Sequence, residues 1–292
     1  LKASQRVLPA VPLTVQQATL ARLEAPLSLP VAAPAGATAD AQGALRGGVR
    51  MSLQPSLAEG LPAVRAWFAD YPFTCLEQKA SRAISLGDAA LWQALLAQLP
   101  VYLDADGLAH YFPPREGDTA GGSDTLSAYL LAASHEASTL DPAWALPAEA
   151  RDAMLRGLDA FVKGQIERQA WSPRQDLTVR KLAAIEALSR HGKASARLLQ
   201  SIEIAPNQWP THALIDWLNI LQRVADVPRR AERLQEVQQI LRSRLSWQGT
   251  KLVFSTEADD RWWWLMQNGD VNTARLLLAV MDDPAWKDDM GR

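Results

Sequence analysis

Residues 71–83, "YPFTCLEQKASRA", contain the single cysteine of the chain, Cys75, and a glutamine three positions later, Gln78. In the first turn of a helix, side chains at this spacing lie on one face, with Cβ atoms about 5 to 6 Å apart. A Cys75 thiolate could then attack the carboxamide carbon of Gln78 and release ammonia. The product is an internal thioester, which amines and hydroxyls attack readily because sulfur is a good leaving group.

A stored thioester needs an apolar cover, because water hydrolyses it slowly. The neighbouring side chains that could shield it are Tyr71, Phe73 and Leu76. Thr74 and Glu77 fit a capping box, which predicts a helix beginning at Cys75. The N-terminus of that helix is expected to lower the pKa of the thiol and favour the thiolate.

A plainer interpretation of this stretch stays open. A lone cysteine is most often a small buried apolar residue, and a glutamine three positions later arises by chance in many helices. A single cysteine cannot form an internal disulfide, so the cysteine count indicates neither an oxidising nor a reducing compartment. Spacing alone therefore does not decide between a thioester and a core cysteine.

The charge balance argues against nucleic-acid binding, with 30 Lys and Arg against 32 Asp and Glu and no basic stripe. The longest apolar runs are far shorter than the roughly 20 residues that cross a bilayer. The chain begins with Leu and has no leader-like segment, so we interpret it as a piece of a longer protein. Any signal or lipid anchor would lie upstream.

The predicted secondary-structure elements that would position these residues divide the chain into two parts. Residues 1–56 contain short apolar stretches separated by Pro and Gly, which predicts a small β segment that cannot bury a core by itself. Residues 57–292 switch to helical spacing and predict a mainly α domain. Helices are expected near 88–99, 124–138, 151–169, 177–192, 211–225 and 230–245.

A weak repeat runs through the helical part: a polar loop with Gly or Pro, a threonine, then an apolar helix. The threonines concerned are Thr125, Thr178, Thr211 and Thr273. Their uneven spacing excludes a short-period solenoid and favours helical hairpins closing into an α/α toroid. An irregular helical bundle is the alternative.

The motif at 71–82 resembles the thioester motif of the alpha-2-macroglobulin and complement superfamily, and most of all the bacterial alpha-2-macroglobulins. An aromatic-Pro pair precedes Cys-Leu-Glu-Gln, and Ser81 and Arg82 follow at the family's positions. The similarity extends to "LQPSLAEGLPAVRAWFADYPF" before the motif and to "SDTLSAYLLA", "NQWPTHALIDW" and "DRWWWLMQNGDVNTARLLLAV" after it. Residues 1–56 then resemble part of the β-domain from which the thioester domain emerges.

This resemblance implies a covalent, single-turnover inhibitor of endopeptidases rather than an enzyme. In the family, cleavage of a bait region exposes the thioester, and a lysine of the protease attacks it. The expected partners are target proteases and the other macroglobulin domains of the parent chain, with no nucleic acid. Tyr71 takes the position of the family's thioester lid. Periplasmic residence, anchored to the inner membrane by an upstream lipid, follows from the bacterial relatives.

Other residues add less. His110 lies in a loop of the kind that faces the thioester in relatives and is a candidate acyl acceptor, although it belongs to an earlier repeat than the family's histidine. The tryptophans of "RWWWLMQNGD" are expected to pack a hairpin end rather than stack a ligand. No Gly-rich phosphate loop and no set of metal ligands occurs, so neither a cofactor nor a metal is expected.

Two other functions remain open. The first is an α/α-toroid enzyme with Cys75 as nucleophile, which would need a base that the sequence does not place. The second is an interaction scaffold that kept the fold without the thioester. Intact mass distinguishes all three, because thioester formation removes one ammonia.

Overall fold

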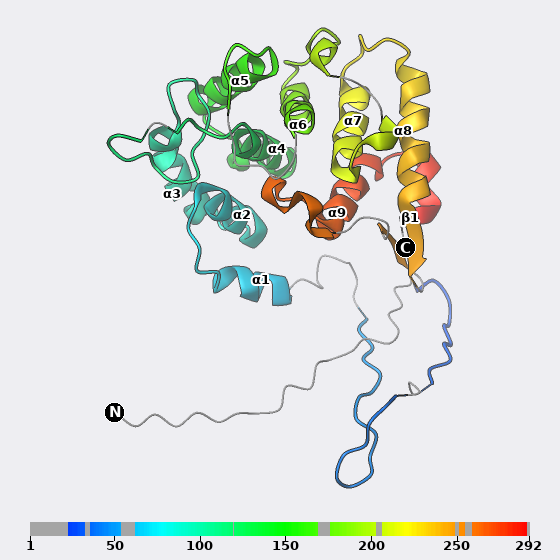
Figure 1. The fold of residues 1–292 in the computed structure, drawn as a ribbon. Helices are drawn as coiled ribbons and strands as arrows, with labels where there is room; N and C mark the ends of the chain where they lie inside the picture. Colours follow the sequence, from blue (N-terminus) through cyan, green and yellow to red (C-terminus); the bar gives the residue numbers. More distant parts are fainter. Residues whose placement is uncertain are drawn as a thin grey trace, which may run out of the picture.

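The computed structural model describes residues 23–32, 36–53, 62–118, 120–168, 176–202, 206–248, 251–254 and 259–290. The described part is mainly helical, as predicted (Figure 1). The α-helices are α1 (Pro62–Ala69), α2 (Leu76–Leu86), α3 (Ala89–Gln98), α4 (Asp124–Leu140), α5 (Ala148–Val162), α6 (Leu177–Arg190), α7 (Thr211–Arg223), α8 (Arg230–Arg244) and α9 (Gly269–Val280). The short 3-10 segments are η2 (Leu99–Tyr102), η3 (Pro142–Trp144), η4 (Leu198–Ser201), η5 (Pro206–Gln208), η6 (Asp259–Leu265) and η7 (Pro284–Asp289).

Local capping residues set several helix ends. Asp88 accepts hydrogen bonds from the first backbone N–H groups of α3, and Ser123 and Asn268 do the same for α4 and α9. Gly87 ends α2 in the left-handed conformation, with φ of 66°. Helix α1 ends at Ala69, three residues before Pro72, as the proline predicts.

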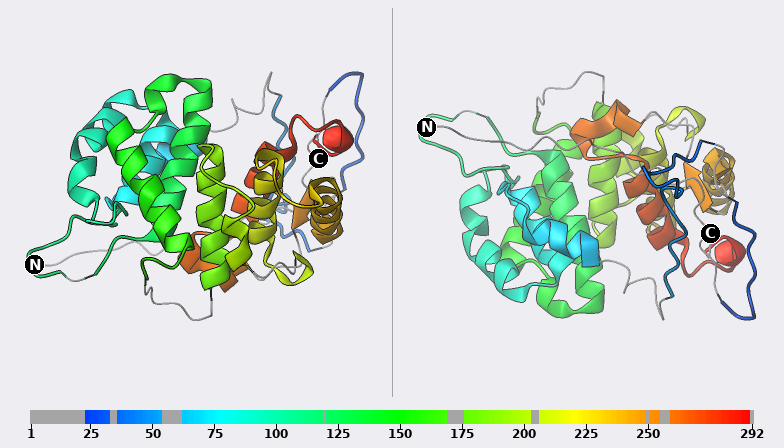
Figure 2. Two further views of the ribbon diagram at one scale, coloured as in Figure 1. Left: turned by 90° about the horizontal axis from the view of Figure 1, so that it is seen from above. Right: turned by 90° about the horizontal axis from the view of Figure 1, so that it is seen from below.

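The helices that begin with the recurring threonine pattern are consecutive neighbours in space. Helix α4 packs on α6, α6 on α7, and α7 on α9. Helix α2, which comes before them in the chain, packs on α4. Helix α3 lies against α2, α5 against α4 and α6, and α8 against α7. In all views the row runs from α3 at one side of the molecule to α8 at the other (Figure 2).

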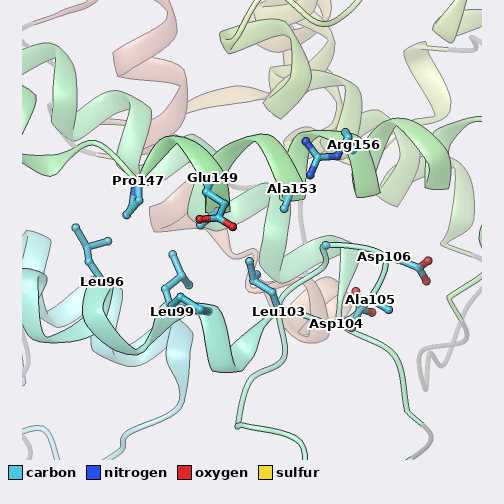
Figure 3. A pocket seen from close by; sticks show the side chains of 13 residues that line it. Leu96, Leu99, Leu103, Asp104, Ala105, Asp106, Pro147, Glu149, Ala153 and Arg156 are labelled. Carbon is cyan, nitrogen blue, oxygen red and sulfur yellow. The ribbon is translucent and has the colours of Figure 1, made fainter.

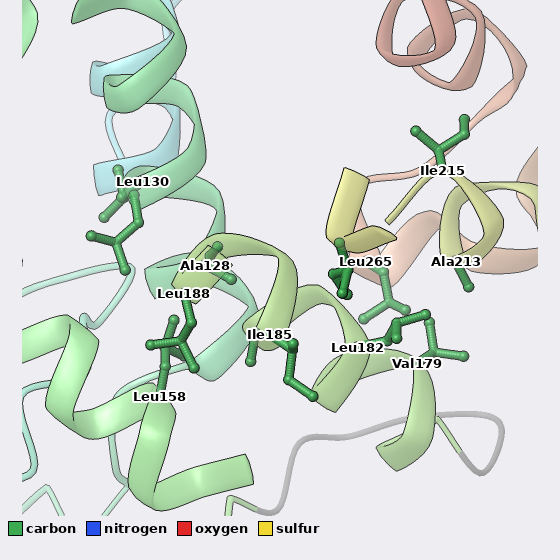
Figure 4. Close-up of a cluster of buried hydrophobic side chains, with 14 of the residues drawn as sticks. Ala128, Leu130, Leu158, Val179, Leu182, Ile185, Leu188, Ala213, Ile215 and Leu265 are labelled. Carbon is green, nitrogen blue, oxygen red and sulfur yellow. The ribbon is translucent and has the colours of Figure 1, made fainter. Parts of the chain in front are cut away.

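One hydrophobic core runs along this row. Helix α7 is central, and all its side chains from Thr211 to Leu221 are buried. Figure 4 shows Leu188 of α6 directed toward Leu158 of α5 and Ala128 of α4. Packing on both sides buries α6 and α7 nearly all round, so that charged side chains such as Glu186 and Asp216 are buried with the apolar ones.

Ion pairs with buried carboxylates link the successive helices of the row. Arg180 of α6 binds Asp124 of α4, with Nε to Oδ2 at 2.9 Å. Arg223 of α7 binds Glu186 of α6 at 3.0 Å. In the same way Arg275 of α9 binds Asp216 of α7. These pairs join residues 37 to 59 positions apart, so no local spacing in the sequence predicts them.

The N-terminal part differs from expectation. The boundary at 56–57 and residues 1–22 lie outside the described residues, and in 23–32 and 36–53 the predicted short strands are not formed. An isolated bridge joins Ala39 to Leu45. Apolar side chains such as Met51, 80 % exposed, are mostly uncovered. A strand without a neighbouring strand cannot complete its hydrogen bonds.

A β-hairpin near the C-terminal end was not predicted. Strand β1 (Leu245–Gln248) pairs antiparallel with β2 (Lys251–Phe254), with Trp247 opposite Leu252. The glycine at 249 between two apolar stretches was the available signal. In the described residues, no helix combines the length and apolar character required to cross a bilayer.

Candidate functional site

Cys75 and Gln78 form the start of α2, one position later than predicted. Cys75, not Thr74, is the N-cap residue, and the capping box is completed by Gln78 rather than Glu77. The backbone N–H of Gln78 approaches the Cys75 sulfur, while the side chain of Gln78 turns back to the backbone of Cys75. Each side chain therefore contacts the backbone of the other residue, although Cys75 lies just before the helix rather than on one of its faces.

The orientation of the Gln78 carboxamide is set at both ends. Its Oε1 accepts a hydrogen bond from the backbone N–H of Cys75 at 3.1 Å. Its Nε2 donates to the hydroxyl of Tyr71 at 3.5 Å. A backbone N–H can only donate, so the oxygen must face Cys75 and the nitrogen must face Tyr71.

The thiol itself behaves differently from the prediction. Cys75 is only 8 % exposed. Burial raises the pKa of its thiol above the ordinary 9.0, and the nearby Glu77 carboxylate raises it further. The N–H groups at the start of α2 lower the pKa by less, so the expected net lowering by the helix N-terminus is wrong.

Aromatic rings gather beside the pair. Tyr71 lies on Trp67 of α1, with ring centroids 4.5 Å apart, and Phe73 packs edge-on against Tyr71 at 5.3 Å. Phe73 is 60 % exposed, whereas Leu76 is fully buried in the core. Of the three predicted shielding residues, Tyr71 contacts the carboxamide of Gln78 directly.

The loop that carries His110 reaches this site. The carbonyl oxygen of Tyr111 accepts a hydrogen bond from the backbone N–H of Leu76 at 2.8 Å, and the N–H of His110 donates to the carbonyl of Tyr102. Burial raises the pKa of the Tyr111 phenol to about 12, and the charges of Glu77 and an ionised Cys75 act in the same direction. Tyr111 thus lies near Cys75, and a role of His110 as acyl acceptor stays a prediction.

Arg168 fastens this loop to the body of the domain. It donates to Asp104 at 2.8 Å, to Asp106 at 2.6 Å and to the carbonyl oxygen of Gly122 at 2.9 Å. Asp104 in turn accepts from the backbone N–H groups of Leu108 and Gly122. Because Arg168 is 46 residues from Gly122, no spacing in the sequence pointed to it.

All four tyrosines of the chain contact α2 or its first residues. Besides Tyr71 and Tyr111, the hydroxyl of Tyr102 accepts from Lys79 at 3.0 Å. The hydroxyls of Tyr129 and Ser81 are hydrogen-bonded at 2.6 Å, and Ser81 also donates to Glu77 at 2.6 Å. The surroundings of α2 are therefore unusually rich in phenols compared with the rest of the described chain.

A cavity of about 380 Å³ opens between α3 and α5 (Figure 3). Leucines of α3 and η2 line one wall, and Glu149 and Arg156 of α5 line the other. Asp104 and Asp106, which bind Arg168, also line it, whereas Cys75, Gln78 and the residues that contact them directly do not. No group of three or more potential metal ligands occurs in the part of the chain that the structure describes.

The tryptophan cluster packs as expected. Trp262 lies beside Trp264 and His212, and Nε1 of Trp264 donates to Asp176 at 2.8 Å. Trp263 between them is 58 % exposed. Two of the three rings therefore serve packing.

Comparison of the chain with protein-family models, with curated proteins and with solved structures gave no match.

Proposed function

We propose that the chain is the thioester domain of a covalent protease trap of the bacterial alpha-2-macroglobulin type. The observation that carries the proposal is the reciprocal capping contact at the start of α2, in which the Cys75 thiol meets the backbone N–H of Gln78 and the Gln78 carboxamide accepts from the backbone N–H of Cys75. The burial of Cys75 supports a stored bond, because a thioester survives only where water is kept away.

The reaction with a target is an acyl transfer that occurs once. A protease lysine amine adds to the thioester carbonyl, the carbon–sulfur bond breaks, and the departing thiolate of Cys75 takes up the proton that the amine loses. An amide between Gln78 and the protease remains, so the domain is consumed and is no enzyme. His110, if it attacked first, would pass the acyl group onward through an acyl-imidazole.

The ring arrangement is part of the proposal. The successive packing of α2, α4, α6, α7 and α9, with α3, α5 and α8 beside them, supports an α/α toroid over residues 57–292. In this arrangement residues 1–56 belong to the preceding β-domain, whose other strands would supply the neighbours that the exposed apolar side chains lack.

The partners follow from the same function. Target proteases would be bound covalently, and the other macroglobulin domains would carry the bait and control exposure of the thioester. The proposed location is the periplasm, with a lipid anchor in the full-length protein.

Intact mass tests the proposal. The purified chain should be lighter than its sequence by one ammonia and should lack a free thiol. Methylamine should add at Gln78 and release the thiol, and Cys75→Ala should abolish both effects. If the purified chain has the mass calculated from its sequence and a free thiol from the first measurement, it contains no thioester, and the interaction scaffold is the function indicated. The same mass with repeated turnover of an acyl substrate would indicate a cysteine enzyme instead.

A further inference from the structure

We propose that Tyr71 donates the proton with which ammonia leaves when the thioester closes. This inference rests on the proposed function and concerns how the bond is made, whereas a lid only protects the finished bond. The structure places the Tyr71 hydroxyl 3.5 Å from Nε2 of Gln78, the nitrogen that must depart. An amide nitrogen is a poor leaving group until it is protonated, so the group that touches it controls this step.

The step balances with the groups at hand. The thiol of Cys75 loses its proton to solvent, and the thiolate adds to the carboxamide carbon of Gln78. The carbon–nitrogen bond then breaks while Tyr71 transfers its hydroxyl proton to the nitrogen, and ammonia leaves. Water returns a proton to Tyr71, so the net change is loss of one ammonia.

The oxygen end of the Gln78 carboxamide already has a hydrogen-bond donor for the tetrahedral intermediate that forms when the thiolate adds. Negative charge develops on Oε1 as the thiolate adds, and this atom already accepts the backbone N–H of Cys75 at 3.1 Å. That N–H belongs to the N-terminus of α2, where the aligned peptide dipoles favour negative charge. Oxyanion donor and proton donor therefore act on the two ends of one amide.

Tyr71 is better placed for this role than the other polar groups around α2. The hydroxyls of Tyr102 and Tyr129 are hydrogen-bonded to Lys79 and Ser81, and the Glu77 carboxylate accepts from Ser81. Packing of the Tyr71 ring on Trp67 holds the hydroxyl in position.

The experiment measures closure in the whole chain. Ammonia opens the thioester and regenerates the carboxamide and the thiol; after its removal, closure is followed by release of ammonia, by intact mass and by loss of the free thiol. Tyr71→Phe keeps the ring on Trp67 and removes the hydroxyl, so closure should slow about 100-fold. Tyr102→Phe removes a hydroxyl that does not touch Gln78 and should close at the wild-type rate.

Two further measurements separate proton donation from packing. Imidazole buffer, which supplies a small diffusible acid, should partly restore closure in Tyr71→Phe, and Tyr71→His should close faster than Tyr71→Phe. Methylamine uptake by whatever thioester has formed should be equal in Tyr71→Phe and wild type, because the ring still covers it. If the wild type forms the thioester and Tyr71→Phe closes it at the same rate, only the role of Tyr71 is overturned. If the wild-type chain never forms a thioester, the proposed function is overturned as well.

Discussion

The carboxylate of Glu186 in α6 accepts hydrogen bonds from Arg223 of α7 at 3.0 Å and from Arg190 of its own helix at 2.8 Å. Burial by itself would raise the pKa of Glu186, but the arginines outweigh it and the pKa is lowered. Glu186→Gln leaves the buried Arg190 and the partly exposed Arg223 with only the half-exposed Glu136 as carboxylate partner, and should lower the free energy of unfolding by about 3 kcal/mol. Urea unfolding followed by circular dichroism measures this loss.

The matched control is Glu232→Gln. Its ion pair with Arg229 is exposed on both sides, so solvent already screens it. The urea midpoint of this variant should stay close to that of the wild type. Equal losses in the two variants would show that burial does not distinguish the pairs.

Gly122→Ala should destabilise the loop that reaches the Cys75 site. A Cβ at this position would lie 2.2 Å from the carbonyl oxygen of Leu108, so the backbone has to move. We expect a loss of about 1 to 3 kcal/mol in the free energy of unfolding. Gly48→Ala meets no atom within 4 Å and serves as the control. A Gly122→Ala chain as stable as Gly48→Ala would contradict the close contact.

His212 makes stability depend on pH. Burial, helped by the charge of Arg275, lowers its pKa from 6.5 to about 3. Between these two pKa values the imidazole is protonated in the unfolded chain but neutral in the folded chain. The stabilisation from the neutral His212 is therefore present above pH 6.5 and is lost as the pH falls. Between pH 7 and pH 5 the free energy of unfolding should drop by about 2 kcal/mol from this residue.

His212→Leu tests this dependence. The variant should unfold at urea concentrations that differ less between pH 7 and pH 5 than those of the wild type. Part of the dependence should remain, because the pKa values of His135 and His191 are also lowered by burial. An unchanged slope would show that His212 titrates normally.

The Cys75 thiol should react slowly once the thioester is absent. In Gln78→Ala no thioester can form, and burial still raises the pKa of the thiol above 9.0. Alkylation by iodoacetamide should therefore reach half its maximal rate above pH 9, and the same chain in urea should react faster at pH 7.5. Alkylation that is faster in the folded chain would contradict a raised pKa.

Local signals in the sequence predicted the helices well. The apolar periodicity marks helices such as α4, α6 and α7. The predicted start of α2 is one residue too early because two pairs, Thr74 with Glu77 and Cys75 with Gln78, both suit a capping box. The structure uses the second pair, next to the hydrogen bond from the Leu76 N–H to the Tyr111 carbonyl, which the sequence does not reveal. Element type was thus easier to predict than the residue at which an element begins.

The long-range contacts were beyond sequence reasoning. The pKa of Cys75 depends on how deeply neighbouring segments bury it, whereas the capping signal contains only the local helix N-terminus. Likewise, Arg168 and Tyr111 contact residues that are distant from them in the sequence, such as Asp104 and Leu76. The pairing of Cys75 with Gln78 could be predicted because it lies within one helical turn; the groups around it come from other elements.

Every tyrosine of the chain contacts one helix, three through the hydroxyl and Tyr111 through its backbone carbonyl. Because Tyr71, Tyr102, Tyr111 and Tyr129 all contact α2 or its first residues, isotope-labelled tyrosine gives an NMR spectrum whose few signals come entirely from the surroundings of Cys75 and Gln78. The chain therefore carries built-in spectroscopic probes, and events at this helix can be followed without attaching a foreign label.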